Sequence, residues 1–181
     1  QARDGHNLIP NDHLRTFWEI LQYGNYKHVY NGGAYSLFYM PYRDISKYGP
    51  DGYFVQSHKS SILRNKDYQL MAGVGYGKRG EIFDCHVLKN ETLFTKEGQA
   101  INPMTENEAK ICLSYFNSII PQYIFNTYAG QHKASGYVNL MPYPIFDLQS
   151  DIIVNKTERL IQLKRFWLAL DETCIEFHHL L

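Results

Sequence analysis

Two groups of polar side chains in the sequence have the chemistry to contact nucleic acid. Arg64, Asn65 and Lys66 are adjacent, and Lys78 and Arg79 follow in a stretch that holds five cations and one acid. Lysine and arginine bind phosphate, and arginine and asparagine hydrogen-bond the edges of bases. On spacing alone, a solvated surface of mixed charge is slightly favoured over a binding site.

The second group closes a glycine-rich run, "MAGVGYGKRGEI", at residues 71–82. Such a run can hold the phosphate end of a cofactor when a strand precedes it and the N-terminus of a helix follows. Here the next segment, "EIFDCHVL", is β-prone. The glycines are therefore predicted to serve turns or a close approach between strands, and no cofactor is expected in this chain.

No other motif predicts catalysis or metal binding. Glu108 and Lys110 match the E-x-K part of a metal-dependent nuclease core, but that chemistry needs them on a strand, and here they open a helix. Cys85 and His86 would point to opposite faces of a strand, so they could not share a metal ion. The sequence has no G-x-S-x-G motif. We predict no catalytic residue, no metal and no enzymatic activity for this chain alone.

The bulk composition limits the partners and the compartment. The 181 residues carry eighteen basic and eighteen acidic side chains, so a polyanion could bind only through a local patch. Three widely spaced cysteines argue against a disulfide framework and for a reducing compartment. No segment approaches the roughly 20 apolar residues that span a bilayer, and no signal-peptide pattern opens the chain. A cytoplasmic protein without membrane contact is predicted.

The elements that must position these residues change type along the chain. Residues 11–23 place Leu14, Phe17 and Leu21 at helical spacing after a cap-capable Asn or Asp, which predicts a short helix. Between about 26 and 103 the sequence consists of short β-prone runs separated by turn residues. These runs, which include "GYFVQ" and "ETLF", predict an antiparallel, loop-rich β region.

Helical spacing returns in the last third of the chain. Thr105 and Glu108 form a capping-box signature, and a helix is predicted over 105–128, kinked or divided by Pro121. Residues 147–170 interleave apolar and charged side chains and are predicted to form a terminal helix.

The predicted fold class is α+β. It has an N-terminal helix, a β-rich middle region over about 26–103 and a helical region over about 105–181. Inside the helical region, the proline-containing run 137–146 is expected to be a connector or an edge strand. Residues 1–181 are treated as a single domain.

Several segments resemble, in order, those of one protein family. The start "QARDGHN" is similar to "GLQTGDN", and "FWEI" followed by "YNGGAYSLFY" resembles W-E-V followed by "YNKGGEYSPYY". Residues 60–101 resemble an R-N-x-x-Y-x-F-x-x-G-x-T-W segment followed by "GxIF…KGxAI". "LSYFNSIIPQYIF", "SGYVNLMPYPIFD" and "LDETCIEFHHLL" resemble its closing segments. The family is that of bacterial adenine-N6 DNA methyltransferases, of the BREX PglX-like and type IIG restriction-modification groups, in their C-terminal target-recognition (specificity) region.

The resemblance implies that this chain selects a DNA site for a catalytic domain that lies N-terminal to it. In the family, an Asn/Asp-Pro-Pro-Tyr motif binds the flipped adenine, and this sequence contains no Pro-Pro. S-adenosylmethionine is therefore expected in the N-terminal domain, and this chain, which starts at Gln1, is expected to be a piece of a longer polypeptide. The expected partners are double-stranded DNA and the methyltransferase domain of the same polypeptide.

The resemblance also implies a set of DNA-contacting residues. In this view "GVGYGKRG" is a glycine-hinged turn between recognition strands. The expected contacts are Arg64, Asn65, Lys66, Lys78 and Arg79, with Asn31, Tyr35, His132 and Lys133 as lesser candidates. The alternative is a protein-interaction module whose tyrosine-rich loops hold another defence-system subunit. A third possibility, a small independent enzyme, would require a bound cofactor.

Overall fold

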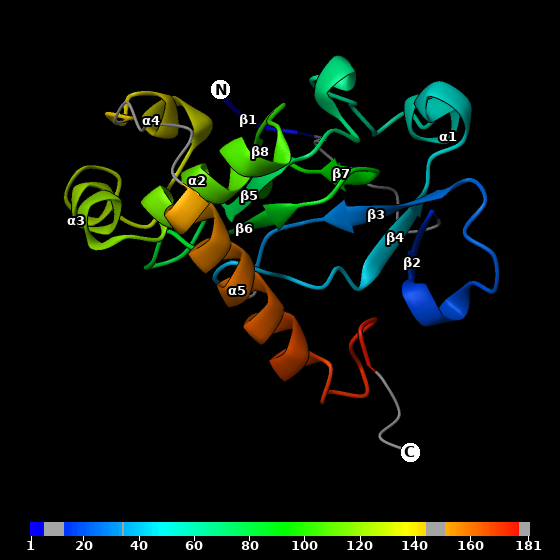
Figure 1. The fold of residues 1–181 in the computed structure, drawn as a ribbon. Helices are drawn as coiled ribbons and strands as arrows, with labels where there is room; N and C mark the ends of the chain where they lie inside the picture. The colour runs from blue at the N-terminus through cyan, green and yellow to red at the C-terminus, as the bar shows by residue number, and fades with distance from the viewer. Residues whose placement is uncertain (6–12, 34, 144–150, 178–181) are drawn as a thin grey trace.

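The computed structural model describes residues 1–5, 13–33, 35–143 and 151–177 (Figure 1). Two β-sheets form the first part of the molecule, and helices follow from residue 106 onward. The fold is therefore α+β, with a helical C-terminal region, as the sequence predicts.

The first sheet is antiparallel throughout, with the strand order β1-β8-β5-β6. Its strands are β1 (Ala2–Arg3), β5 (Gly73–Gly77), β6 (Cys85–Leu88) and β8 (Gly98–Ile101). Strands β5 and β6 are neighbours in the chain, whereas β1 pairs with β8 from the other end of the β region. The first sheet therefore ties the start of the chain to residues near position 100.

The second sheet is mixed, with the strand order β2-β4-β3-β7. Its strands are β2 (Leu14–Thr16), β3 (Tyr26–Tyr30), β4 (Asp44–Lys47) and β7 (Thr92–Phe94). Strands β2 and β3 each run antiparallel to β4, but β3 and β7 are parallel, with His28 opposite Thr92. The expectation of a wholly antiparallel region is wrong at this pair, because β7 reaches the second sheet from the first by a crossover rather than a hairpin.

Aromatic side chains fill the space between the two sheets. One buried cluster combines residues of both: Tyr30, Tyr42, Leu88, Phe94 and Ala100. His86 of β6 points into this cluster, and its ring lies 4.4 Å from that of Tyr30. Cys85, one residue earlier, belongs to the core on the other face of the sheet. The predicted opposite orientation of Cys85 and His86 is confirmed.

The helical region packs against the first sheet. Its helices are α2 (Glu106–Phe116), α3 (Ile119–Tyr128), α4 (Ser135–Asn139) and α5 (Asp151–Leu168). Helix α2 lies on β5 and β6, and α5 crosses α2 on the outside (Figure 1). The predicted terminal helix is confirmed over the described part of its range. No helix among the described residues is both long enough and apolar enough to cross a bilayer.

The start of α2 confirms the predicted capping box. The Thr105 hydroxyl accepts a hydrogen bond from the N–H of Glu108, and the Glu108 carboxylate accepts one from the N–H of Thr105 at 2.8 Å. The N–H and the hydroxyl of Thr105 both donate to the Glu108 carboxylate, and these two hydrogen bonds lower the pKa of Glu108. The predicted division of the helix is also confirmed: α2 ends before Ser118, and Pro121 lies in the first turn of α3, where a missing N–H donor costs little.

The predicted N-terminal helix is wrong. Residues 11 and 12 lie outside the described part of the chain. Leu14–Thr16 forms strand β2 and pairs with β4, and a 3₁₀ turn, Phe17–Glu19, follows it. The pairing with β4 overrides the helical spacing of the apolar residues, because local propensity is weak against tertiary contacts.

Two other segments also differ from the prediction. "GYFVQ" forms the one-turn helix α1 (Tyr53–Gln56), after a 3₁₀ helix at Pro50–Gly52, instead of a strand. Gly49 and Gly52 have φ values of 70° and 76°, which turn the chain where a strand would have to extend. The expected connector over 137–146 begins inside helix α4, and its last residues lie outside the described part of the chain.

Candidate nucleic-acid interface

Within the glycine-rich run, Gly73–Gly77 forms β5, an interior strand of the first sheet, and all five residues of this strand are buried. A Cβ atom on Gly73 would lie 2.2 Å from the carbonyl oxygen of Ile101, and one on Gly75 would lie 2.6 Å from Nε2 of His86. The glycines therefore allow neighbouring strands and side chains to approach closely, as predicted. The glycine-hinged turn is wrong, because the turn begins only after β5, at Lys78.

Two other segments fix the turn that follows β5. The N–H of Lys78 donates to the carbonyl of Glu97, in the turn between β7 and β8, at 2.8 Å. The N–H of Lys133 donates to the carbonyl of Lys78 at 2.7 Å, and Arg79 forms an isolated antiparallel bridge with His132. Four residues singled out in the sequence thus lie together, although they come from two distant segments.

The two cations of this turn have different neighbours. Nε of Arg79 lies 3.0 Å from the carboxylate of Glu97, and the Arg79 side chain is 68% exposed. Lys78 is half-buried and pairs with no carboxylate in the described residues. An exposed ion pair contributes about 0–1 kcal/mol, so a phosphate could replace Glu97 at Arg79 at small cost. The turn can therefore offer two positive charges to an anion.

Lys133 is not accessible to a ligand, which corrects its assignment as a contact residue. Its side chain is buried, and its ammonium group donates to the carbonyls of Gly130, at 3.0 Å, and Gly80. Burial lowers the pKa of Lys133, and the nearby carboxylate of Asp84 opposes that change. Lys133 holds the turn after β5 against the segment that follows α3, so its role is to position the loop.

Asn31 and Tyr35 line a cavity of about 490 Å³. Oδ1 of Asn31 accepts a hydrogen bond from the hydroxyl of Thr95 at 2.9 Å, and Tyr35 is 58% exposed. Arg43 and Lys164 line the same cavity, and sequence reasoning missed both. An amide, an aromatic ring and two cations are groups that bind a base and its phosphate.

Arg64 and Asn65 hold the start of the chain. Nη1 of Arg64 lies 2.9 Å from the carboxylate of Asp4, and the amide of Asn65 donates to the Asp4 carbonyl at 2.7 Å. Asn65 has a φ of 49°, a left-handed conformation that asparagine tolerates better than most residues. Lys66 opens the 3₁₀ helix Lys66–Tyr68, is exposed, and has no carboxylate partner in the described part of the chain. Of the two cations in this segment, Lys66 is thus the freer.

The turn between β7 and β8 connects these groups. The carbonyl of Thr95 accepts a hydrogen bond from the N–H of Gly5, next to Asp4, at 3.2 Å. The hydroxyl of Thr95 donates a hydrogen bond to the side chain of Asn31. Two residues later, the carbonyl of Glu97 accepts the hydrogen bond from Lys78 that fixes the turn after β5. Lys96 lies in the same turn and was missed in the sequence. A feature of the sequence that could have identified Lys96 is its position, as a cation between two β-prone runs.

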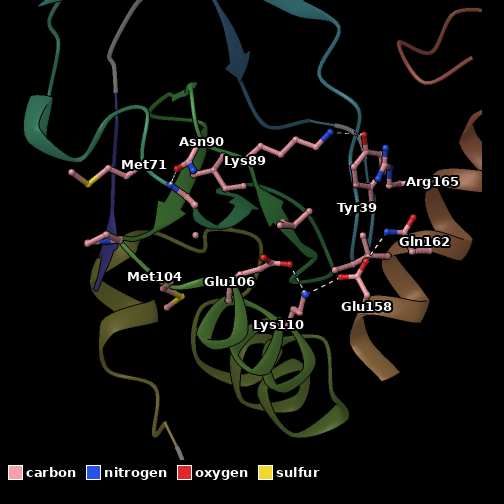
Figure 2. A pocket seen from close by; sticks show the side chains of 17 residues that line it. Tyr39, Met71, Lys89, Asn90, Met104, Glu106, Lys110, Glu158, Gln162 and Arg165 are labelled. Atoms are coloured by element: carbon pink, nitrogen blue, oxygen red, sulfur yellow. Dashed lines mark hydrogen bonds and ion pairs between the residues drawn. The ribbon is translucent and has the colours of Figure 1, made fainter. Parts of the chain in front are cut away.

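A second cavity, of about 640 Å³, lies between the first sheet, α2 and α5 (Figure 2). Figure 2 shows Lys110 between two acids, with its ammonium 2.6 Å from Glu106 and 2.9 Å from Glu158. Because Glu158 belongs to α5, this contact ties α5 to α2.

A second charged group joins three residues that line this cavity, Tyr39, Lys89 and Arg165, to Glu176, which does not line it. Glu176 accepts hydrogen bonds from Arg165 at 2.7 Å, from Lys89 at 3.2 Å and from the hydroxyl of Tyr39. Burial would raise the pKa of Glu176, but these three donors outweigh it and lower the pKa to about 2. The charges that line this cavity are thus engaged with one another, which indicates a structural role.

Among the described residues, no three His, Cys, Asp or Glu side chains gather in a way that could hold a metal ion. Burial raises the pKa of the thiols of Cys85 and Cys112, in the second case to about 12, which makes them poor nucleophiles. No protein-family model and no curated protein matches this sequence.

Proposed function

We propose that the chain is a DNA target-recognition domain of an adenine-N6 DNA methyltransferase of the restriction-modification or phage-defence type. The observation that carries this proposal is the convergence of Asn31, Lys78, Arg79 and His132 around the turn between β7 and β8. Side chains from separate segments that meet at one surface suit a ligand with regularly spaced phosphates and exposed base edges. The ordered resemblance of the sequence to that family supports the same conclusion.

In this proposal the residues take different roles. Lys78 and Arg79 bind phosphate, and Arg79 exchanges Glu97 for the phosphate when DNA is bound. Asn31 and Tyr35 contact a base at their cavity, where Arg43 and Lys164 add positive charge. The further contacts are Arg64, Lys66 and His132, while Asn65 and Lys133 hold the loops in place.

The chemical step belongs to another part of the same polypeptide. An N-terminal methyltransferase domain binds S-adenosylmethionine and transfers the methyl group, while this chain selects the double-stranded DNA site. The absence of a Pro-Pro sequence here supports this division of labour. The protein acts in the cytoplasm.

The proposal is tested by titrating a fluorescently labelled DNA duplex with the 181-residue chain and measuring anisotropy. With about four phosphate contacts, the affinity should fall roughly 100-fold between about 50 mM and 200 mM salt. Absence of binding at the lower salt concentration, or an affinity that does not change with salt, would contradict the proposal.

A second candidate function, a protein-interaction module, is favoured by the exposed side chains of α3. Ile119, Tyr123 and Tyr128 of this helix are largely exposed, and aromatic side chains in such positions are common at protein interfaces. If the affinity for DNA does not change with salt, the protein-interaction module becomes the better candidate function.

A further inference from the structure

Helix α5 carries apolar side chains on two opposite faces. The inner face, with Thr157, Ile161 and Leu168, packs towards α2 and the core of the first sheet. The opposite face, here called the outer face of α5, includes Leu170 just beyond the helix end. Its large apolar side chains are all exposed: Ile152, Leu160, Leu163, Phe166, Trp167 and Leu170.

The outer face is too apolar for a surface that stays in contact with water. Phe166 and Trp167 are each 71% exposed, and at about 150–250 Å² per aromatic side chain they alone expose roughly 200–350 Å². The four aliphatic side chains extend the patch beyond what a monomeric protein normally leaves open. The outer face therefore requires a partner.

The spacing on this face selects the kind of partner. On α5, positions 152, 156, 160, 163 and 167 advance by three or four residues at each step, and Leu170 follows just beyond the helix end. All but one of these positions are apolar, and they form a straight seam of the type that packs side chains into the gaps of a second helix. The partner should therefore be helical.

The charges on this face select the chemistry of the partner. Lys156 and Arg159 are exposed on it and have no carboxylate partner in the described residues. Glu158 points the other way, to Lys110 on α2, at 2.9 Å. The only carboxylate that α5 exposes beside this face is Asp151, in the first turn. A second copy of this chain would place four cations in one interface, so self-pairing is disfavoured.

We propose that the outer face of α5 binds an amphipathic helix that lies outside residues 1–181 and whose apolar seam is flanked by acidic residues. The seam covers the exposed apolar side chains, and the acids pair with Lys156 and Arg159. This inference uses none of the residues assigned to DNA, so it stands whether or not the chain binds DNA.

The test uses the full 181-residue chain and two synthetic helical peptides of four heptads. Both peptides have leucine at the a and d positions, and they differ only in having glutamate or lysine at the e and g positions. The acidic peptide should bind roughly tenfold more tightly than the basic peptide, as expected for two added ion pairs. Binding should also shift the fluorescence of Trp167 to shorter wavelength as this side chain leaves water.

Variants separate the proposed contact from a general loss of structure. Leu163→Gln should abolish binding, whereas Leu21→Gln, at a fully exposed leucine in the N-terminal part, should leave it unchanged. The double variant Lys156→Glu and Arg159→Glu should reverse the preference, so that the basic peptide binds more tightly. An unfolded variant could not produce such a reversal.

Other outcomes would overturn the proposal. Equal affinity for the two peptides, or no reversal in the double variant, would refute the acidic helix. Self-association in sedimentation experiments that Leu163→Gln abolishes would assign the face to a second copy of the chain. Binding to vesicles of phosphatidylglycerol and phosphatidylcholine that is lost in Leu163→Gln would assign it to a lipid surface.

Discussion

The imidazole ring of His86 lies edge to face against the phenol ring of Tyr30, with 4.4 Å between the ring centres, in the space between the two sheets. The ring centre of Tyr42, a second tyrosine of the cluster between the sheets, lies 5.9 Å from that of His86. Both ring nitrogens of His86 are buried and lack a hydrogen-bond partner in the described residues. Burial lowers the pKa of His86 to about 3, so the folded protein keeps this ring neutral.

We predict that the free energy of unfolding falls as the pH is lowered towards 5. The folded-state pKa of His86 lies below the unfolded value, so the unfolded chain takes up the proton first. The stabilisation is complete above about pH 6.5 and is lost progressively as the pH falls towards 3. One such histidine accounts for about 2 kcal/mol between about pH 7 and pH 5. Urea unfolding at several pH values measures this.

The variant His86→Leu isolates this effect from those of other groups. It removes the titrating ring but keeps an apolar side chain in the cluster between the sheets. Its free energy of unfolding should depend less on pH over the same range than that of the parent protein. An equal pH dependence in the two proteins would show that His86 is not responsible.

Local signals in the sequence predicted the elements that one turn of chain determines. Thr105 and Glu108 identified the start of α2, because a capping box depends on residues three positions apart. Leu14 and Phe17 have helical spacing as well, yet Leu14 belongs to a strand. Its conformation depends on β4, whose pairing with β2 the sequence does not display. An element was predicted correctly where residues close in the sequence determine it, and wrongly where a contact with a distant segment does.

Gly73→Ala should destabilise the protein by roughly 1–3 kcal/mol. The new Cβ atom would lie 2.2 Å from the carbonyl oxygen of Ile101, and this oxygen cannot move without disturbing the pairing of β5 with β8. Gly136→Ala is the matched control, because no atom lies within 4 Å of its Cβ position in α4. The control should be neutral or stabilising by about 0.5–1 kcal/mol. Thermal unfolding compares the two variants, and equal melting temperatures would contradict the argument.

Lys133→Met should lower the free energy of unfolding by roughly 1–3 kcal/mol, because the hydrogen bonds that the buried ammonium group donates to the carbonyls of Gly80 and Gly130 are lost. Lys59→Met, the same change at an exposed lysine, should have almost no effect. Hydrogen exchange should become faster in the turn after β5. Unchanged exchange there would mean that Lys133 does not hold this turn.

If the chain binds DNA as proposed, Lys78→Ala should weaken binding at all sequences and reduce the salt slope by about one. Lys59→Ala serves as the control on charge alone, because Lys59 lies outside the proposed interface. Anisotropy titrations at several salt concentrations give the slope. Equal slopes for the parent, Lys78→Ala and Arg79→Ala would remove both cations from the proposed interface.

Glu97→Gln should act in the opposite direction to Lys78→Ala. The change removes the carboxylate that lies 3.0 Å from Nε of Arg79, so the guanidinium becomes free for a phosphate. DNA affinity should increase and its salt dependence should become steeper. Weaker binding by Glu97→Gln, with unchanged stability, would show that Arg79 needs its acid to bind.

The sequence identified some members of the candidate interface but not their roles. Lys78 and Arg79 were visible as adjacent cations, and the structure places them beside His132. The burial of Lys133 was not visible, because it depends on carbonyls from two other turns. Arg43 was missed because the cavity that it shares with Asn31 exists only in the folded chain.

The chain moves repeatedly from one sheet to the other: β1 belongs to the first, β2 to β4 to the second, β5 and β6 to the first, β7 to the second and β8 to the first. The second sheet is complete only after Thr92–Phe94 has been synthesised, because β3 pairs with β7, and the first only after Gly98–Ile101, because β1 pairs with β8. Such long-range pairing gives a high contact order, and it predicts slow folding that starts only after most of the β region has left the ribosome. The two sheets should then melt together in one cooperative transition.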